Sequence, residues 1–329
     1  MTPLVTVAVP VYKRLNYVGG AVRSVAAQDY PNIELIVSDN GQNGETLAAI
    51  VREHYPKPFV FRRNPQTVTI VEHFNQLVAA ASGTYFVLLS DDDYISPEYV
   101  SSLVARLEAD SQIAVAIGRV ETFSEDDERV LQTTDGKALP PALMSFMELI
   151  RTWSTYKHRY LSFTTNVSRT AEIRAVGGYP DFDRANGSDD GLLIKLILGR
   201  NVAFEARGTF HHRIHNTSYG KAASIDSLAL ACRQYLHFLR HDPRLKALQQ
   251  RDPATYNELW QRTSTMVYNT YLGRWRGLYR DQMPVLDWMR AGLALPLHPR
   301  FTRDALASII YRLPGFSNLA RHRNAKPIQ

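Results

Sequence analysis

Three consecutive carboxylates, Asp91, Asp92 and Asp93, follow an apolar run at residues 85–89. Adjacent like charges at the end of a buried strand are costly unless a cation lies beside them. Carboxylate oxygens suit a hard divalent ion such as Mg²⁺ or Mn²⁺, and an ion of this kind can hold a diphosphate. The alternative is a solvated acidic turn before a helix that begins near Pro97, since helix dipoles favour negative charge there.

The elements that must position this cluster alternate between strand and helix. Residues 6–11 and 33–38 are short, nearly continuous apolar runs, and a helical pattern at 18–25 separates them. This is typical of a βαβ unit in a parallel sheet that is covered on both faces. Two further helical patterns, around 47–54 and 70–81, precede strands at 59–62 and 85–89. The chain is therefore predicted to be α/β, with ligands bound at the carboxyl ends of the strands.

The remainder of the chain is predicted to become mostly helical beyond residue 224. Between residues 97 and 214 the pattern predicts, in order, a helix after Pro97, a strand at 113–123, a surface loop at 124–141, an amphipathic stretch at 143–153, a strand near 161–167, a helix at 188–198 and two strands at 202–205 and 209–214. Helices are then expected at 228–239, 256–274, 285–295 and 305–313. We place the boundary near Lys221, with a body at 1–222 and a basic helical region at 223–329.

Composition excludes several classes of protein. The 329 residues are 45% hydrophobic, which allows a substantial core. A single cysteine, Cys232, rules out an internal disulfide framework and indicates a reducing compartment, with Cys232 expected as a small buried side chain. The N-terminus lacks the pattern of a signal peptide, and no apolar run approaches 18 residues. These features predict a cytoplasmic location.

Charge is concentrated at one end of the chain. Residues 223–329 carry a net charge of +9, whereas residues 1–222 carry −3. Arginines and aromatic residues interleave at 274–280 and 288–293, a composition that suits a helix lying on an anionic membrane, here the inner face of the plasma membrane. A helical appendage packed on the body, or a contact within a homo-oligomer, explains the same composition equally well.

Four ordered stretches together resemble the family 2 glycosyltransferases. They are residues 5–14 (VTVAVPVYKR), 33–44 (IELIVSDNGQNG), 83–97 (GTYFVLLSDDDYISP) and 177–215, which contains GGYP, SDDGLLIKL and HHRIH. The resemblance covers about residues 4–220. It implies a GT-A fold with a mixed, mostly parallel sheet, a nucleotide-sugar donor, a divalent metal and transfer with inversion at the sugar carbon.

The resemblance also implies nucleotide contacts at the ends of the first two strands. Pro10, Val11 and Tyr12 would lie against the base and ribose, although a proline that ends a strand explains Pro10 equally well. Asp39 would be the first Asp of a DDGS-like signature that binds the base. Here the signature reads DNGQ, and the alternative role of Asp39 is an Asx turn with Gly41.

For the metal site the resemblance leaves two registers open. When the sequence is aligned through Pro97, the first Asp of the family's D-x-D falls on Ser90 and the second on Asp92; the other register pairs Asp91 with Asp93. We favour Asp92 as the metal ligand, with Asp91 and Asp93 as contenders for the metal or the ribose. In the R-x-H segment His215 is the preferred third ligand, and His212 is the second choice. Candidate cations for the diphosphate are Arg213, Lys13 and Lys221.

Inverting transfer requires a base that removes the proton of the acceptor hydroxyl. The resemblance places this base in the pair that opens the helix at 188–198, with Asp189 preferred and Asp190 as the alternative. Ordinary capping of a helix N-terminus explains the same residues. Gly178, together with Gly177, would lie against the sugar, whereas a plain turn before Pro180 is the competing explanation.

These inferences predict a metal-dependent hexosyltransferase that uses a UDP-, dTDP- or GDP-sugar to build a surface polysaccharide of the O-antigen type, on a glycan or lipid-linked acceptor. One alternative is a sugar nucleotidyltransferase, but residues 12–15 (YKRL) are a poor phosphate loop. The other is a nucleic-acid-binding module that uses the basic region. No recognition motif for nucleic acid is present, so no nucleic-acid partner is expected.

Overall fold

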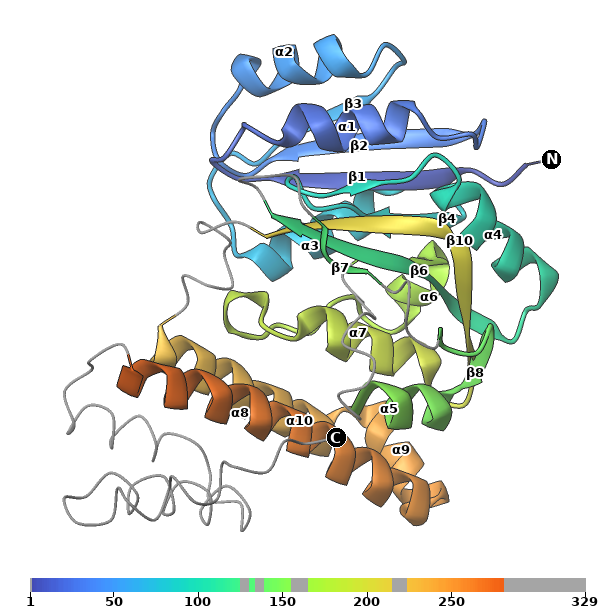
Figure 1. Ribbon diagram of the computed structural model, residues 1–329, viewed down its shortest axis with the longest axis vertical. Helices are drawn as coiled ribbons and strands as arrows, with labels where there is room; N and C mark the ends of the chain where they lie inside the picture. Colours follow the sequence, from blue (N-terminus) through green and yellow to red (C-terminus); the bar gives the residue numbers. More distant parts are fainter. Residues whose placement is uncertain (1, 125–129, 134–138, 155–164, 215–223, 281–329) are drawn as a thin grey trace.

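The computed structural model describes residues 2–124, 130–133, 139–154, 165–214 and 224–280, and it is a mixed α/β fold (Figure 1). The strands are β1 (Val5–Val11), β2 (Ile33–Asp39), β3 (Val60–Arg63), β4 (Tyr85–Leu88), β5 (Tyr94–Ile95), β6 (Ile113–Ser124), β7 (Val130–Thr133), β8 (Leu143–Ser145), β9 (Val167–Arg169) and β10 (Asn201–Ile214). The α-helices are α1 (Val18–Ala26), α2 (Glu45–His54), α3 (Ile70–Ala80), α4 (Tyr99–Ala109), α5 (Phe146–Ser154), α6 (Thr170–Ala175), α7 (Ser188–Ile197), α8 (Ile225–His241), α9 (Pro243–Arg251) and α10 (Pro253–Arg280).

The strands form one sheet with the order β3-β2-β1-β4-β9-β6-β10-β5. Strand β1 is parallel to β2 and β4, β2 is parallel to β3, and β10 is parallel to β6. Strand β9 is antiparallel to both of its neighbours, β4 and β6. This architecture confirms the predicted fold class, because the central sheet is mostly parallel, is flanked by helices and is followed by C-terminal helices.

Both faces of the central strands are buried, as their continuous apolar sequences predicted. On β1, Val7 and Val9 belong to a cluster with residues of α1, α2 and α4. Ala8, between them, belongs to a second cluster with residues of α3, α6 and α7. Helices therefore cover each face of the sheet. Ligands are expected to bind at the carboxyl ends of the parallel strands, which the helices leave open.

Two sequence-based predictions about elements were wrong, and some elements were not predicted. The predicted loop at 124–141 contains β7, which pairs antiparallel with β6. The two strands predicted at 202–205 and 209–214 are one strand, β10, whose register along β6 shifts between Glu205 and Thr209. The shift is tolerated because two glycines meet there: a Cβ on Gly118 would lie 2.5 Å from the Gly208 carbonyl oxygen. Helices α6 and α9 were not predicted.

Other predictions hold or fall partly outside the described residues. Strand β9 begins at Val167, at the end of the range predicted at 161–167, and most of that range is outside the described residues. The helices predicted at 285–295 and 305–313 also lie outside them. Cys232 is 6% exposed, and its thiol lies 4.0 Å from the Val267 carbonyl, which confirms it as a small buried side chain. Burial raises the pKa of that thiol to about 12.

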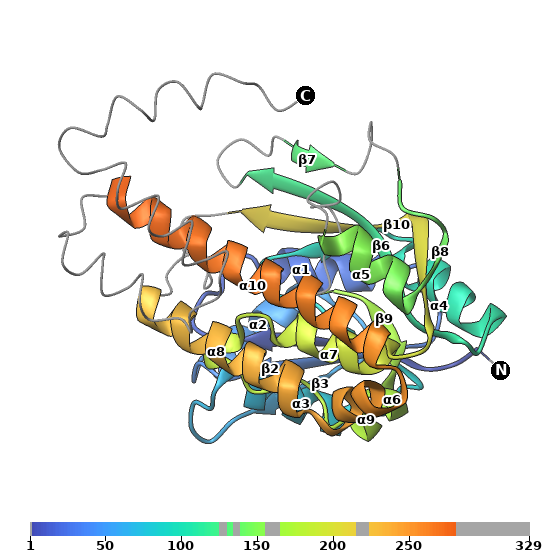
Figure 2. The ribbon, with the colours of Figure 1, turned by 90° about the horizontal axis from the view of Figure 1, so that it is seen from below.

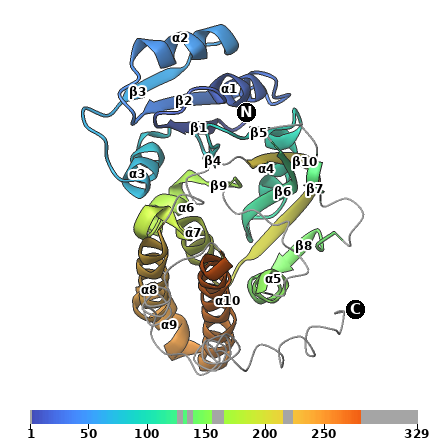
Figure 3. The ribbon, with the colours of Figure 1, turned by 60° about the vertical axis from the view of Figure 1, so that its left-hand side comes forward.

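The C-terminal helices form an additional layer on the far side of α7 from the sheet (Figures 2 and 3). Tyr235 and Leu239 of α8, and Leu259 of α10, belong to the same buried cluster as Phe86 of β4 and Leu193 of α7. The division of the chain at residue 222 stays a prediction. Within the described part of the chain, no helix has an apolar run long enough to cross a bilayer.

Candidate active site

The carboxyl ends of β1, β2 and β4 lie at one edge of the sheet because the three strands are parallel. Val11 ends β1 and is paired in register with Asp39, which ends β2. The acidic triplet follows β4. Strand β10 reaches the same place from the other half of the sheet, where the Arg213 backbone N–H donates to Asp93 Oδ1 at 2.8 Å.

One arginine lies between two carboxylates of the triplet. Arg14 Nη2 is 2.5 Å from Asp92 Oδ2 and 3.2 Å from Asp91 Oδ1, so a single nitrogen bridges both side chains. A second arginine, Arg213, donates from Nε to the Asp92 backbone oxygen at 3.0 Å. The triplet is therefore partly neutralised by two cations that arrive from β1 and β10.

The two arginines do not offset the burial and the mutual repulsion of the three carboxylates. Burial and the neighbouring charge of Asp92 raise the pKa of Asp91 to about 7, against the opposing effect of Arg14. Asp93 is only 4% exposed, and burial followed by the charge of Asp92 raises its pKa well above the usual range. Oxygen donors that resist ionisation in this way fit a hard divalent cation, because such an ion relieves both causes.

The residues expected to complete a metal site are not all described. Among the described residues, no three His, Cys, Asp or Glu side chains are arranged so that together they could hold a metal ion. His215 lies outside the described residues, as does Lys221. His212 stacks on Phe210, with ring centroids 6.1 Å apart. His211 stacks on Tyr94 at 4.3 Å, and its Nδ1 lies 3.1 Å from Glu121 Oε2.

Aromatic rings fix the guanidinium of Arg213. Its Cζ lies 4.6 Å from the ring centroids of both Tyr17 and Phe123, a cation–π arrangement on two sides. Arg213 thus occupies a rigid position beside the triplet. Lys13, by contrast, extends over the ring of Tyr12 at 5.3 Å, and Tyr12 itself is 42% exposed.

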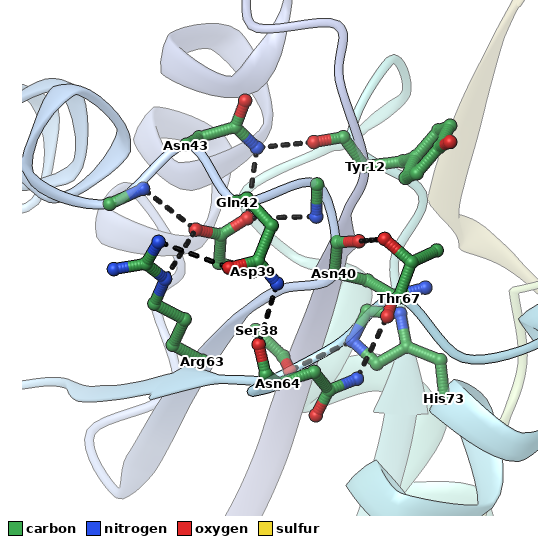
Figure 4. Close-up of polar contacts among 12 residues, drawn as sticks. Tyr12, Ser38, Asp39, Asn40, Gln42, Asn43, Arg63, Asn64, Thr67 and His73 are labelled. Atoms are coloured by element: carbon green, nitrogen blue, oxygen red, sulfur yellow. Dashed lines mark hydrogen bonds and ion pairs between the residues drawn. The ribbon is translucent and has the colours of Figure 1, made fainter.

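Asp39 is completely buried and engaged by donors (Figure 4). Its Oδ1 accepts from the Gly41 N–H and Asn43 Nδ2, both at 2.9 Å, and its Oδ2 accepts from the Gly44 N–H at 2.7 Å. Burial alone would raise the pKa of this carboxyl, but the surrounding N–H donors hold it below its usual value. The contact with Gly41 is the Asx turn weighed from the sequence, and it coexists with the predicted position at the end of β2.

A network around Asn40 and His73 supports the loop that follows Asp39 (Figure 4). Asn40 Oδ1 accepts from the Val68 N–H at 3.0 Å, and its Nδ2 donates to the Val68 carbonyl at 3.0 Å. His73 Nε2 lies 2.8 Å from Ser38 Oγ. Burial lowers the pKa of His73 to about 4, with the charge of Asp39 opposing this, so the ring is neutral near pH 7. The edge predicted to bind the nucleotide base, including Pro10 and Val11, is thus held by a rigid scaffold.

The glycine turn before α7 is tied to two helices. Asn75 of α3 forms a pair of hydrogen bonds with the backbone of Tyr179, from Nδ2 to the carbonyl at 3.0 Å and from the N–H to Oδ1 at 2.8 Å. The buried Lys195 of α7 donates to the carbonyls of Val176, at 3.0 Å, and Gly178. Gly178 has a φ of +66°, and a Cβ there would lie 2.2 Å from Asn75 Oδ1. Only glycine fits this position.

The acidic pair lies in the first turn of α7, which begins at Ser188 after Gly187. Burial and then the charge of Asp189 raise the pKa of Asp190 well above the usual range. Burial, followed by the charges of Asp190 and Asp189, raises the pKa of Tyr235 on α8. The pair therefore favours a state with one ionised carboxylate, which is the arrangement expected of a proton acceptor with a neutral neighbour.

Several residues that shape the site were not predicted from the sequence. The sequence assigns Arg14 no contact with the acidic triplet. The only signal for that contact is a cation two residues beyond Tyr12, after an apolar strand. Asn75 lies in a helical pattern with no signal of its own. Both contacts join segments at least 77 residues apart, so they follow from topology.

Comparisons with known proteins show what the chain is similar to. The sequence profile of the family described as glycosyl transferase family 2 matches residues 6–174, more than half of the chain. Glycosyltransferase GlyA of Streptococcus pneumoniae is 28% identical over 131 residues, which cover 37% of this chain and 18% of GlyA. Chondroitin synthase of Pasteurella multocida is 28% identical over 112 residues, 34% of this chain and 12% of that protein. The chain thus spans well under half of these relatives.

Two solved structures share the fold. S. aureus TarS 1-349 in complex with UDP-GlcNAc has a TM-score of 0.53 and 16% identity, over 71% of this chain and 66% of TarS 1-349. The mannosyltransferase PcManGT from Pyrobaculum calidifontis, in complex with GDP-Man and Mn²⁺, has a TM-score of 0.55 and 13% identity, over 95% of this chain and 88% of that one. At these identities the likeness concerns the fold alone.

Proposed function

The chain belongs to glycosyl transferase family 2, and from this premise we propose that it transfers a sugar from a nucleotide diphosphate sugar to a hydroxyl group of a glycan or lipid-linked glycan. The transfer proceeds with inversion, in the synthesis of a surface polysaccharide. A UDP-, dTDP- or GDP-sugar is the donor. Relatives and structural neighbours whose names include chondroitin synthase and a complex with UDP-GlcNAc support this substrate class.

The observation that carries the proposal is the charge arrangement at the carboxyl ends of β1, β4 and β10. Two carboxylates with a shared arginine, Asp91 and Asp92 with Arg14, lie beside a third carboxylate and a fixed guanidinium, Asp93 and Arg213. Negative and positive groups in alternation can hold a diphosphate together with its counter-ion. A purely structural acidic turn needs neither the burial of Asp93 nor the cation–π support of Arg213.

A divalent ion, Mg²⁺ or Mn²⁺, fits the donor atoms of this cluster. Asp92 would hold it, with Asp91 or Asp93 contributing and His215 as a further ligand. When bound, such an ion neutralises charge that develops on the leaving diphosphate. The complex of PcManGT with GDP-Man and Mn²⁺ supports the choice of metal.

The chain's own residues perform the remaining tasks. Asp189 accepts the proton of the acceptor hydroxyl, and Asp190 is the alternative base. Gly178 gives the sugar a close approach to the backbone, and Asp39 with Pro10, Val11 and Tyr12 lines the nucleotide. Arg213 stabilises the departing diphosphate.

The remaining parts of the proposal concern the protein's place in the cell. The body at 1–222 contains the residues that carry out the transfer. The basic region at 223–329 brings it to an anionic membrane surface at the inner face of the plasma membrane or makes a homo-oligomer contact. The protein is then cytoplasmic, which matches its single cysteine.

A thermal-shift screen of sugar nucleotides, with and without Mn²⁺, tests the donor, because a ligand that binds only the folded state raises the melting temperature. A rise that needs both the sugar nucleotide and Mn²⁺ is expected. Product analysis then tests the reaction. Release of a nucleoside diphosphate supports the proposal, whereas release of pyrophosphate identifies a nucleotidyltransferase and overturns it.

A further inference from the structure

The loop that leads into α7 has an unusual backbone. Arg184 and Ala185 have φ angles of +52° and +59°, and Gly187 follows at +84°. The left-handed conformation is unfavourable for a residue with a side chain, because Cβ then lies too close to the following carbonyl oxygen. Two consecutive residues of this kind keep the conformation only where neighbouring structure holds them in place. These residues lie immediately before the proposed base, so whatever holds this loop also aims Asp189.

Helix α8 supplies the contacts that hold it. The Asp183 backbone N–H donates to Gln234 Oε1 at 2.6 Å, and Ser227 Oγ donates to Asp183 Oδ2. Within the loop, the Ala185 and Asn186 N–H groups donate to the carbonyls of Phe182, at 2.9 Å, and Asp183, at 3.1 Å. Asp183 is thus gripped at its backbone and at its side chain by residues two turns apart on one helix.

Aromatic packing reinforces the polar contacts. The Phe182 ring lies 5.1 Å from the ring of Tyr235 and 5.7 Å from that of Phe238. Tyr235 also fills the space in front of Gly187, where a Cβ would lie 2.9 Å from the tyrosine ring. The charges of Asp190 and Asp189 both act on Tyr235. The ring therefore touches both the strained loop and the surroundings of the acidic pair.

Helix α8 is itself held firmly. Ser224 caps its N-terminus by accepting the Ser227 N–H at 3.1 Å. Its other face packs against α10 through Ala229, Cys232 and Leu236, together with the buried Tyr271 and Trp275. A clamp built on such a helix has little freedom to move.

We propose that α8 positions the catalytic base, with Ser227 and Gln234 holding Asp183 and Tyr235 supporting Gly187, so that the basic C-terminal region completes the active site of the body. Ser227, Gln234 and Asp183 are positioning residues that act through the loop. The inference rests on the proposed function for the identity of the base. The part of it that concerns the loop is independent of that function.

The test uses the full chain with Ser227→Ala, Gln234→Ala and the double variant. Ser101→Ala on α4 is the matched control, because its hydroxyl donates only within its own helix, to the Glu98 carbonyl. Hydrogen exchange of peptides that cover 181–190 is measured first. We expect each single variant to speed exchange there about fivefold, the value of one net hydrogen bond, while Ser101→Ala leaves it unchanged. The melting temperature monitors global folding. Gln234→Ala, at a partly buried position, serves if Ser227→Ala fails to fold.

Kinetics with UDP-GlcNAc or GDP-Man, whichever the wild type turns over, form the second arm. We expect kcat to fall about tenfold or more, the equivalent of roughly 1.4 kcal/mol, with donor KM within twofold and a displaced acid limb in the pH profile. Ser227→Thr, which keeps the hydroxyl, restores kcat.

The two arms separate the failure modes. Unchanged exchange at 181–190 overturns the clamp whether or not the chain transfers sugar. Faster exchange with unchanged kcat and pH profile overturns the positioning of the base. A wild type that releases no nucleoside diphosphate from any sugar nucleotide overturns the proposed function, and with it the identity of the base.

Discussion

Asp39 and Asp190 show how the surroundings of a carboxyl group decide its role. Asp39 is buried but receives N–H donors from Gly41, Asn43 and Gly44 of its loop, so it is held ionised. Burial and the neighbouring carboxylate of Asp189 raise the pKa of Asp190. The first arrangement suits a fixed acceptor for a nucleotide base or a loop, and the second suits the partner of a proton acceptor. The sequence shows the position of both residues but not this difference, because most of the donors to Asp39 are backbone groups.

At the residue scale, Asp189→Asn tests the base. The amide keeps the size of the side chain but cannot accept a proton, so we expect kcat to fall at least about 100-fold. Donor affinity, measured by titration calorimetry, should stay within twofold. Asp181→Asn, at an exposed residue of the same segment, is the control. Full turnover by Asp189→Asn would move the base to Asp190.

His73 gives a pH prediction. Its pKa is about 4 in the folded protein and near 6.5 in the unfolded chain, so between these values the unfolded state binds more protons. The free energy of unfolding should therefore fall as the pH drops from 6.5 to 4, by up to about 3 kcal/mol from this residue. In urea titrations, His73→Gln should lose this part of the pH dependence. His237→Gln, at an exposed histidine, should retain it, and a parallel decline in all three proteins would contradict the assignment.

At the element scale, the turn before α7 shows how a glycine pair can be asymmetric. Gly177 and Gly178 are both left-handed, but a Cβ on Gly177 would meet nothing within 4 Å, whereas one on Gly178 would strike Asn75. The sequence motif GGYP does not distinguish them, because the difference comes from α3, 100 residues earlier. The two positions therefore form a matched pair of variants.

We expect Gly177→Ala to cost about 1–2 kcal/mol of unfolding free energy, the conformational term alone. Gly178→Ala must also displace Asn75 and break its two hydrogen bonds with Tyr179. Its cost should exceed that of Gly177→Ala by about 1 kcal/mol or more. Urea titration of both variants measures the difference. Equal costs would mean that Asn75 can move aside without a loss of unfolding free energy.

The elements that could be predicted from the sequence are those with a strong local signal. β1 and β2 are apolar runs, and α3 has a regular hydrophobic face. β10 was split in two because the segment Ala206, Arg207 and Gly208 looks like a turn, and only its pairing with β6 makes it continuous. Helix α9 was missed because only Leu245 and Leu248 are buried. Its start signal, Asp242 followed by Pro243, is nevertheless present in the sequence.

At the scale of the whole molecule, the buried cluster beneath the sheet continues into α8, α9 and α10. Leu239, Leu245 and Leu259 are each no more than 1% exposed in the same cluster as Leu193 of α7. Burial of such side chains contributes about 1.5–3 kcal/mol each. The sequence indicated a basic helical region after residue 222. It did not indicate how deeply this region packs, because the apolar face of a helix does not identify the surface that it packs against.

A chain that ends at residue 222 should therefore aggregate or show no cooperative thermal transition, because it exposes the apolar face of α7. A chain that ends at residue 280 should melt in one transition, within a few degrees of the full chain, since it keeps α8–α10. Circular dichroism and scanning calorimetry measure both. A stable fragment of residues 1–222 with the melting temperature of the full chain would show that the helices are a dispensable appendage.

The same truncation at residue 280 tests the proposed membrane contact. Sedimentation with anionic vesicles should remove the full chain from solution at low salt and release it as salt rises. The chain that ends at residue 280 has lost the basic segment at 288–329 and should bind less. Equal, negligible sedimentation of both would eliminate the membrane proposal and leave the homo-oligomer contact for the basic region.

The hydrogen bonds from α8 to Asp183 also matter for engineering new specificities into this fold. The family profile ends at residue 174. A chimera joined at that border would pair the proposed donor-binding half of one protein with the loop and helices of another. A graft that carries residues 165–280 as one block keeps Ser227, Gln234 and Tyr235 together with the strained loop that they hold. Recombination points that keep contacting segments in one block should then yield active hybrids more often than points chosen by sequence similarity.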